Sequence, residues 1–324
     1  MLTKFLAILG NTFLETIRQP IFGVLLWVAV GLLIINPSMA AYSLASGNDN
    51  KILKDVGLST LLLYGLLASV FSATSVLTRE IESFTVLTVI SKPVPRPVFL
   101  LGKFAGVTTA VLFGSYLLGI VFLMTVRHGV METASSKFDQ PVLVFGLGAL
   151  AVSLLAGAWG NYVYGWHFVS TLNSWAIPLG TAALLLALCF GPQWMPQSPF
   201  KDFGDGQIIY AVAMVFGAVM VLTALAVALA TRFSQVVTLV FCGGAFLLFL
   251  LTDHLFGRNA GDAEIYKLLY AIVPNFQFFW AGDALTQEIP IPASQVGLAL
   301  GYAGLVSLAL MCLGIALFET REVG

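Results

Sequence analysis

Charged residues are scarce in this chain of 324 residues. They make up 10% of it, whereas 59% of the residues are apolar. A soluble fold carries roughly a quarter charged residues, so this composition excludes an ordinary soluble domain and favours a surface that faces lipid. Disorder is excluded as well, because low hydrophobicity is its signature. The 15 Lys and Arg against 16 Asp and Glu leave no basic excess, which argues against a nucleic-acid partner.

Motifs for metal binding and catalysis are also missing. The three cysteines (Cys189, Cys242 and Cys312) lie in apolar runs without CxxC spacing, and the three histidines are far apart in the sequence. The chain contains no GxxxxGK[ST] phosphate loop, no HExxH and no GxSxG. We therefore expect no metal site, no cofactor bound by this chain and no enzymatic activity of its own.

Long stretches without Lys, Arg, Asp or Glu dominate the sequence, and a helix needs about 20 apolar residues to cross a bilayer core. The stretches are Gln19–Asn48, Val56–Thr78, Phe104–Val126, Gln140–Phe200, Gly206–Thr231, Phe233–Thr252 and Ile289–Phe318. They predict an all-α, polytopic membrane helix bundle forming a single domain, residues 1–324, with about eight transmembrane helices: six plus an extra hairpin within Gln140–Phe200. A re-entrant second arm of this hairpin, Ile177–Phe190, is the alternative, and it would change the count.

None of these stretches contains a formal charge. Ion-coupled carriers and most ion channels usually place such groups along the path, although one Asp or Lys at a helix centre costs about 3 kcal/mol. Their absence from the sequence of the spans argues against a transporter driven by its own ion gradient. Energy for any transport is then expected to enter elsewhere.

An even number of crossings puts both termini on one side of the membrane. That face would carry eight Lys and Arg and five acids, and the opposite face seven Lys and Arg and eleven acids. The basic residues barely distinguish the two faces, and acids contribute little to the positive-inside rule; together they favour termini inside. Residues 253–293 then form an external loop, in which a re-entrant helix is an open alternative.

The first twenty residues form an amphipathic pattern. Lys4, Asn11, Glu15 and Arg18 fall on one stripe of a helical wheel, opposite a face of Leu, Phe and Ile, and Pro20 ends the segment. This pattern predicts an interfacial helix over residues 1–20 that lies on the membrane. A secretory signal with a cleavage site at Ser38-Met39-Ala40 is the competing interpretation.

One dense charged segment, residues 79–103, connects two spans. It has three prolines within five residues, which predict a stiff elbow beside the membrane. Its residues include an acid followed by Thr-x-Leu (Glu82, Thr85 and Leu87), then Ser-Lys-Pro-Val-x-Arg (91–96) and Leu-Leu-Gly-Lys (100–103). This pattern resembles the coupling segment of type-2 ABC exporter permeases.

Two further stretches resemble the same family. Ala230–Thr238 is similar to its short cytoplasmic turn between two later spans, and Val273-Pro274-Asn275-Phe276 with the last span and Phe318–Glu322 is similar to its C-terminal end. Two features depart from the family: Phe84 stands where a small residue is usual, and the hairpin adds to the six spans that are common.

The resemblance implies a membrane subunit that pairs with a second permease copy or a paralogue and with two separate ABC ATPase subunits. ATP and Mg would be bound by those ATPases, and this chain would sit in the lipid bilayer, in a bacterial plasma (inner) membrane with both termini cytoplasmic. The residues implied to couple to the ATPase are Arg79, Glu80, Glu82, Thr85, Leu87, Lys92, Pro93 and Arg96. The 1–20 helix would be an elbow at the inner surface.

Two other functions remain open from the sequence. The chain could be a non-transporting membrane anchor or scaffold for a partner ATPase, or an intramembrane enzyme acting on lipid or isoprenoid groups. The missing intramembrane acids argue against the enzyme. Family resemblance does not identify a cargo, because type-2 permeases export drugs, lipids, polysaccharides and other compounds.

Overall fold

The computed structural model describes residues 1–41, 49–82, 95–130, 138–259, 261 and 263–320, with side chains at 41, 49 and 78–82 outside the description. This part of the chain is helical and contains no strand, which confirms the expected all-α class. The long helices are α1 (Leu2–Ile17), α2 (Pro20–Ala41), α3 (Asp49–Glu82), α5 (Arg96–His128), α6 (Gln140–Tyr164), α7 (Phe168–Leu188), α8 (Gln207–Ala230), α9 (Gln235–Thr252) and α12 (Ala293–Glu319). Between the last two lie a π-helix, η1 (Asp253–Gly257), then α10 (Glu264–Ile272), a 3-10 helix, η2 (Phe276–Phe279), and α11 (Gly282–Thr286).

Eight of the described helices, all the long ones except α1, are long and apolar enough to cross a membrane. The predicted hairpin consists of α6 and α7, which are joined at Gly165, where a φ of 68° ends α6 in the left-handed region that glycine tolerates. Its second arm is longer than Ile177–Phe190. It begins at Phe168 and continues through Pro178, so α7 extends over about 31 Å, the thickness of a bilayer core.

The core of the bundle surrounds α8, which is buried along nearly its whole length. It packs against α3, α5 and α12. Between α3 and α8 the hydroxyls of Ser69 and Thr223, both fully buried, lie 2.7 Å apart. A hydrogen bond inside an otherwise apolar interface fixes the position of the two helices, because either hydroxyl would be costly to bury alone.

The outward surface of the bundle is apolar. On α12, Leu298 and Leu305 are at least 70% exposed, and Val236 and Val240 of α9 are exposed to a similar degree. A soluble protein rarely shows such continuous apolar faces. The surface is therefore consistent with an integral membrane protein whose outer helices contact lipid.

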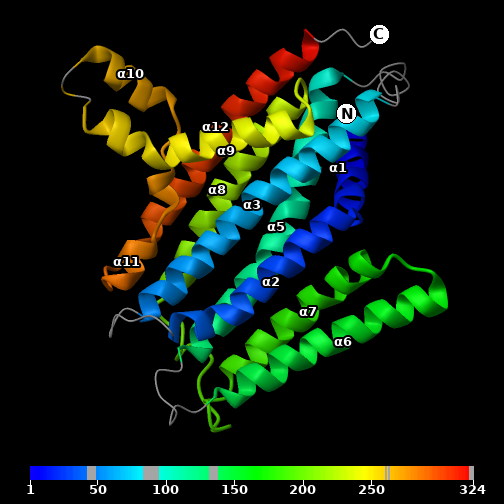
Figure 1. Ribbon diagram of the computed structural model, residues 1–324, viewed down its shortest axis with the longest axis vertical. Helices are drawn as coiled ribbons and strands as arrows, with labels where there is room; N and C mark the ends of the chain where they lie inside the picture. The colour runs from blue at the N-terminus through cyan, green and yellow to red at the C-terminus, as the bar shows by residue number, and fades with distance from the viewer. Residues whose placement is uncertain (42–48, 83–94, 131–137, 260, 262, 321–324) are drawn as a thin grey trace.

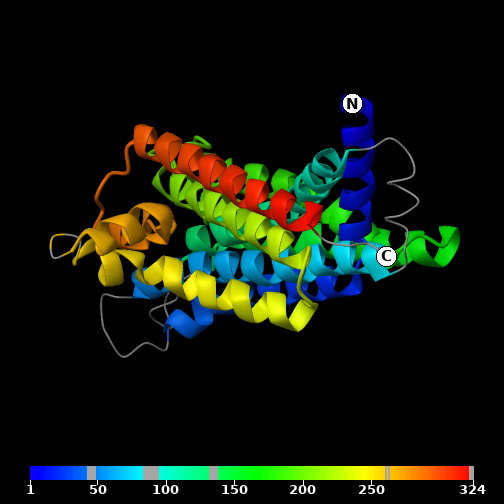
Figure 2. The ribbon, with the colours of Figure 1, turned by 90° about the horizontal axis from the view of Figure 1, so that it is seen from above.

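Two elements stand apart from the main bundle. The α6–α7 hairpin lies along one side of it (Figure 1). Helix α1 lies across one end, transverse to the long helices (Figure 2). Near α1 are the end of α3, the start of α5, the α8–α9 turn and the end of α12 (Figures 1 and 2). The two elements thus contact the bundle at different places.

Two pairs of small residues spaced four apart, Ser115 with Gly119 and Gly297 with Gly301, and the three cysteines lie in different environments. Ser115 is buried, and a Cβ at Gly119 would lie 3.3 Å from Val212, so this pair packs inside the bundle. Gly297 and Gly301 of α12 face open space. Cys242 is buried, Cys189 is half-buried and Cys312 is exposed on α12.

Candidate functional site

The candidate site is the end of the bundle where the predicted coupling segment begins and ends. Arg79, Glu80 and Glu82 lie in the last turn of α3, and their side chains are outside the description. Thr85, Leu87, Lys92 and Pro93 lie outside the described residues. Of the predicted coupling residues, Arg96 is the one whose side-chain contacts are defined.

Arg96 is the first residue of α5, directly after Pro95, whose extended backbone caps the helix. Its Nη1 donates to the backbone oxygen of Glu319 at 2.9 Å and to that of Phe318 at 3.3 Å. The guanidinium also lies 5.8 Å from the centre of the Phe318 ring, which stacks on Phe99 of α5. Arg96 therefore fastens the start of α5 to the last turn of α12.

Arg232, in the turn between α8 and α9, contacts the same helix end. Its Nε donates to the backbone oxygen of Leu317 at 2.8 Å, and its Nη2 donates to the Thr320 hydroxyl. The last four carbonyls of a helix lack intrahelical partners, and the C-terminal end of a helix carries partial negative charge. Two guanidinium groups thus satisfy three of these carbonyls and complement the charge at the end of α12.

The start of α5 is covered by α1. A Cβ at Gly102 would lie 2.8 Å from Ile8 of α1, and a Cβ at Gly106 would lie 2.6 Å from Thr12 and 2.8 Å from the Leu9 backbone oxygen. These glycines therefore let the two helices approach closely. The sequence motif Leu-Leu-Gly-Lys (100–103) forms part of this contact.

Lys103, the last residue of that motif, is 2% exposed beneath α1. Its ammonium lies 3.9 Å from the Glu15 carboxylate of α1 and 5.6 Å from the centre of the Phe99 ring. A buried cation is costly unless a partner offsets the lost hydration. The charged stripe of the N-terminal helix therefore includes a residue, Glu15, that reaches into the bundle.

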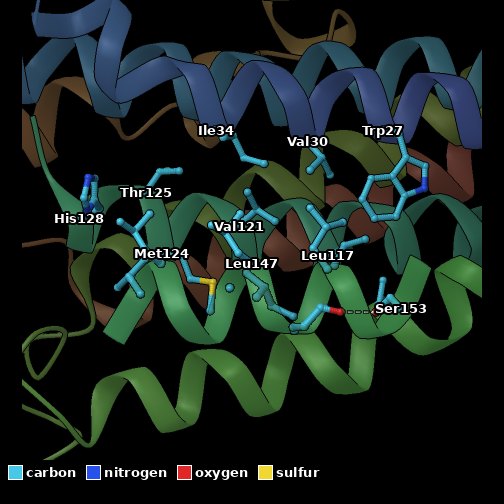
Figure 3. Close-up of a pocket in the computed structure, with 18 of the residues that line it drawn as sticks. Trp27, Val30, Ile34, Leu117, Val121, Met124, Thr125, His128, Leu147 and Ser153 are labelled. Atoms are coloured by element: carbon cyan, nitrogen blue, oxygen red, sulfur yellow. Dashed lines mark hydrogen bonds between the residues drawn. The ribbon is translucent and has the colours of Figure 1, made fainter. Parts of the chain in front are cut away.

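A second candidate site is a cavity of about 150 Å³ between the hairpin and the bundle, shown in Figure 3. Its walls come from α2, α5, α6 and α7. The labelled side chains in Figure 3 that line it are Trp27, Val30 and Ile34 of α2, Leu117, Val121, Met124, Thr125 and His128 of α5, and Leu147 and Ser153 of α6. None of the residues of this lining is Asp, Glu, Lys or Arg, and His128 is its one ionisable side chain.

A buried ion cluster fastens the hairpin at one end of this cavity. The Nε of Arg127, at the end of α5, lies 3.2 Å from an oxygen of Asp139 and 3.2 Å from an oxygen of Asp202. Arg127 and Asp139 are both less than 5% exposed, and Asp139 also caps α6 by accepting from the Val142 N–H. Arg127 Nη2 donates to the backbone oxygen of Phe190, just beyond α7. One arginine therefore holds both arms of the hairpin.

The hairpin is fastened again nearer its turn. Trp27 Nε1 of α2 donates to Asn173 Oδ1 of α7 at 3.0 Å, and Asn173 is fully buried. Sequence reasoning counted Arg127, Asp139 and Asp202 as loop charges on one face of the membrane and missed their contact. Their sequence separation gives no sign of it, since only the folded hairpin brings them together.

Comparison with known protein families, with curated proteins and with solved structures finds no match to this chain.

Proposed function

We propose that this chain is the transmembrane subunit of an ATP-driven ABC exporter, in which separate ATPase subunits supply the energy. The observation that carries the proposal is the convergence on α12. The described ends of three connections come together at one end of the bundle: the start of α5, which follows the segment resembling a coupling helix, the α8–α9 turn and the end of α12, where Arg96 and Arg232 both donate. Such a junction would pass a movement of the segment after α3 to helices α5, α8 and α12 together.

The topology of the proposal is eight crossings with both termini in the cytoplasm of a bacterial cell. Helix α1 is then the elbow at the inner membrane surface. Its transverse placement supports this role (Figure 2), as do the exposed side chains of Leu2, Leu6 and Leu14. Apolar side chains along an interfacial helix enter the boundary between head groups and acyl chains.

In this mechanism the ATPase would bind the segment around Glu80–Ser91 and move it when ATP binding closes the ATPase pair. This chain would form a pair with a second copy or a paralogue. Movement of the segment would shift that pair between inward-open and outward-open populations. The interiors of the described helices α5, α8 and α12 contain no Asp or Glu that could couple transport to an ion gradient. The energy for transport would therefore reach the membrane through the segment after α3.

The test is ATP hydrolysis by the complex in vesicles. The chain is expected to co-purify with a soluble nucleotide-binding protein, and Glu80→Lys or Glu82→Lys is expected to reduce hydrolysis with no loss of folded protein. Glu288→Lys, an exposed acid on the opposite end of the bundle, is the matched control. Unchanged hydrolysis in both acid variants would remove the coupling role. ATPase binding without stimulation by any transported compound would favour the anchor function instead.

A further inference from the structure

The cavity between the hairpin and the bundle has the properties of a lipid site. Its lining spans Trp27 to Pro37 on α2 and Val142 to Ser153 on α6. At 1.5 Å per residue each stretch covers about 15 Å, which is half of a hydrocarbon core of about 30 Å. The cavity therefore has the depth of one leaflet, on the side of the membrane where α5 ends and α6 begins.

The polar atoms in the lining are already used within the protein. Thr125 donates to the backbone oxygen of Phe122, and Ser153 donates to that of Ala149, the bond drawn in Figure 3. The indole N–H of Trp27 is taken by Asn173. Polar groups on a bound molecule would therefore find no hydrogen-bond partner along most of this cavity, whose lining is apolar.

His128 is the exception, and it lies at the leaflet-surface end of the cavity. Its Nδ1 accepts from the Asp139 backbone N–H at 3.4 Å, and its ring stacks on Phe138. An imidazole that accepts at one nitrogen carries its proton on the other. The Nε2–H has no partner within the part of the chain that the structure describes. It can donate to an ester or phosphate oxygen.

We propose that this cavity holds part of one acyl chain of a membrane phospholipid, with the lipid head at His128 and the chain extending toward Trp27. An apolar cavity of about 150 Å³ is large enough for a six-carbon ring, and so for a segment of an acyl chain of similar size. A volume of about 150 Å³ is too small for a turn of helix from a second protein copy, because a helix is about 10 Å across and rises about 5.4 Å per turn. The inference goes beyond the proposed export function and requires only that α5 and α6 cross the bilayer.

Two glycines of α6 provide a matched pair of variants. A Cβ at Gly146 would enter the cavity and meet Met124 Sδ at 3.6 Å, whereas a Cβ at Gly148 would meet nothing within 4 Å, on the exposed side of the helix. Gly146→Phe places a benzene ring where the chain would lie. Gly148→Phe adds the same ring to the same helix outside the cavity.

The experiment uses the full chain in phosphatidylcholine vesicles that contain a small fraction of a phosphatidylcholine with a photoreactive diazirine in one acyl chain. Cross-links are mapped by mass spectrometry. Labelling is expected at Met124, a buried residue of the lining, and is expected to fall there on the order of tenfold in Gly146→Phe, because a ring of that size fills the cavity. Gly148→Phe is expected to keep the parental labelling.

Two results would overturn the proposal: uniform labelling of all lipid-facing helices, or equal labelling in the two glycine variants. If Gly146→Phe does not fold, the smaller Ala149→Leu, also in the lining, takes its place, and its labelling is expected to fall severalfold. These readouts require no ATPase, so they separate the lipid site from the exporter function.

Discussion

Arg96 and Arg232, far apart in the chain, donate to adjacent carbonyls of one helix end. Arg96 reaches Phe318 and Glu319, and Arg232 reaches Leu317. Helix ends in proteins usually find such partners nearby in the sequence. Here both partners come from other connections of the bundle, so the last turn of α12 is fixed by the tertiary fold.

Arg96→Ala is expected to destabilise the protein by about 1 kcal/mol, since hydrogen bonds to partly exposed charged groups are modest in net effect. The measurement is the free energy of unfolding in a mild detergent. Lys201→Ala, at the other end of the bundle, is the control and is expected to change little. If the exporter function holds, Arg96→Ala also lowers ATP hydrolysis by the complex, and normal hydrolysis would contradict a role for this junction in coupling.

Arg127→Ala is expected to cost about 3 kcal/mol, because it leaves Asp139 buried without its counter-charge. The expected loss is seen as a lower melting temperature and as faster proteolysis at the hairpin turn near Gly165.

A charge-free triple variant tests the reason for that loss. Arg127→Met combined with Asp139→Asn and Asp202→Asn removes the uncompensated carboxylates and keeps a capping side chain at 139. It is expected to regain part of the stability. A triple variant as unstable as Arg127→Ala would show that the arginine side chain matters mainly by packing.

Gly106→Leu is expected to destabilise the docking of α1 by about 1 to 3 kcal/mol, because the added side chain meets Thr12 and the Leu9 backbone. Protease cleavage within the first turns of α1 is expected to become faster. Gly10→Leu is the control, since a Cβ there meets nothing within 4 Å. Equal effects of both variants would argue against close packing of α1 on α5.

Trp27→Phe keeps an aromatic ring beside the cavity but removes the donor to Asn173. It is expected to cost about 1 to 2 kcal/mol, because a fully buried amide loses its hydrogen bond. The double variant Trp27→Phe with Asn173→Leu removes both the indole N–H and the amide, so neither side chain is left without a hydrogen-bond partner. A double-mutant cycle on unfolding free energies then isolates the bond, and additive effects would show that it contributes nothing.

The apolar pattern of the sequence predicted the long helices well but not their ends. The charge-free stretch Val56–Thr78 predicted a span that in the structure belongs to α3, which begins at Asp49 and includes Lys51, Lys54 and Asp55. Charged residues interrupt a hydrophobic count but not a helix, because Lys is nearly as good a helix former as Leu. For the same reason α5 begins at Arg96, well before Phe104.

The contacts at the candidate sites were not predictable in the same way. The Arg232 turn was identified by resemblance, yet its bond to Leu317 depends on how α8 and α12 pack. The cavity depends on the hairpin being held by Arg127 at one end and by Asn173 toward the other, which no local pattern encodes. Periodicity reports which face of a helix is apolar, and it does not report which neighbour that face meets.

The two attachments of the hairpin also bear on how the protein should be handled. The outer side of α6 is largely uncovered by the rest of the protein. Lipid in the membrane, or detergent after extraction, therefore contacts this side of the hairpin. Extraction replaces the lipid that contacts α6 with detergent. Stability measured after extraction will accordingly depend on the chain length of the detergent, most strongly for this hairpin.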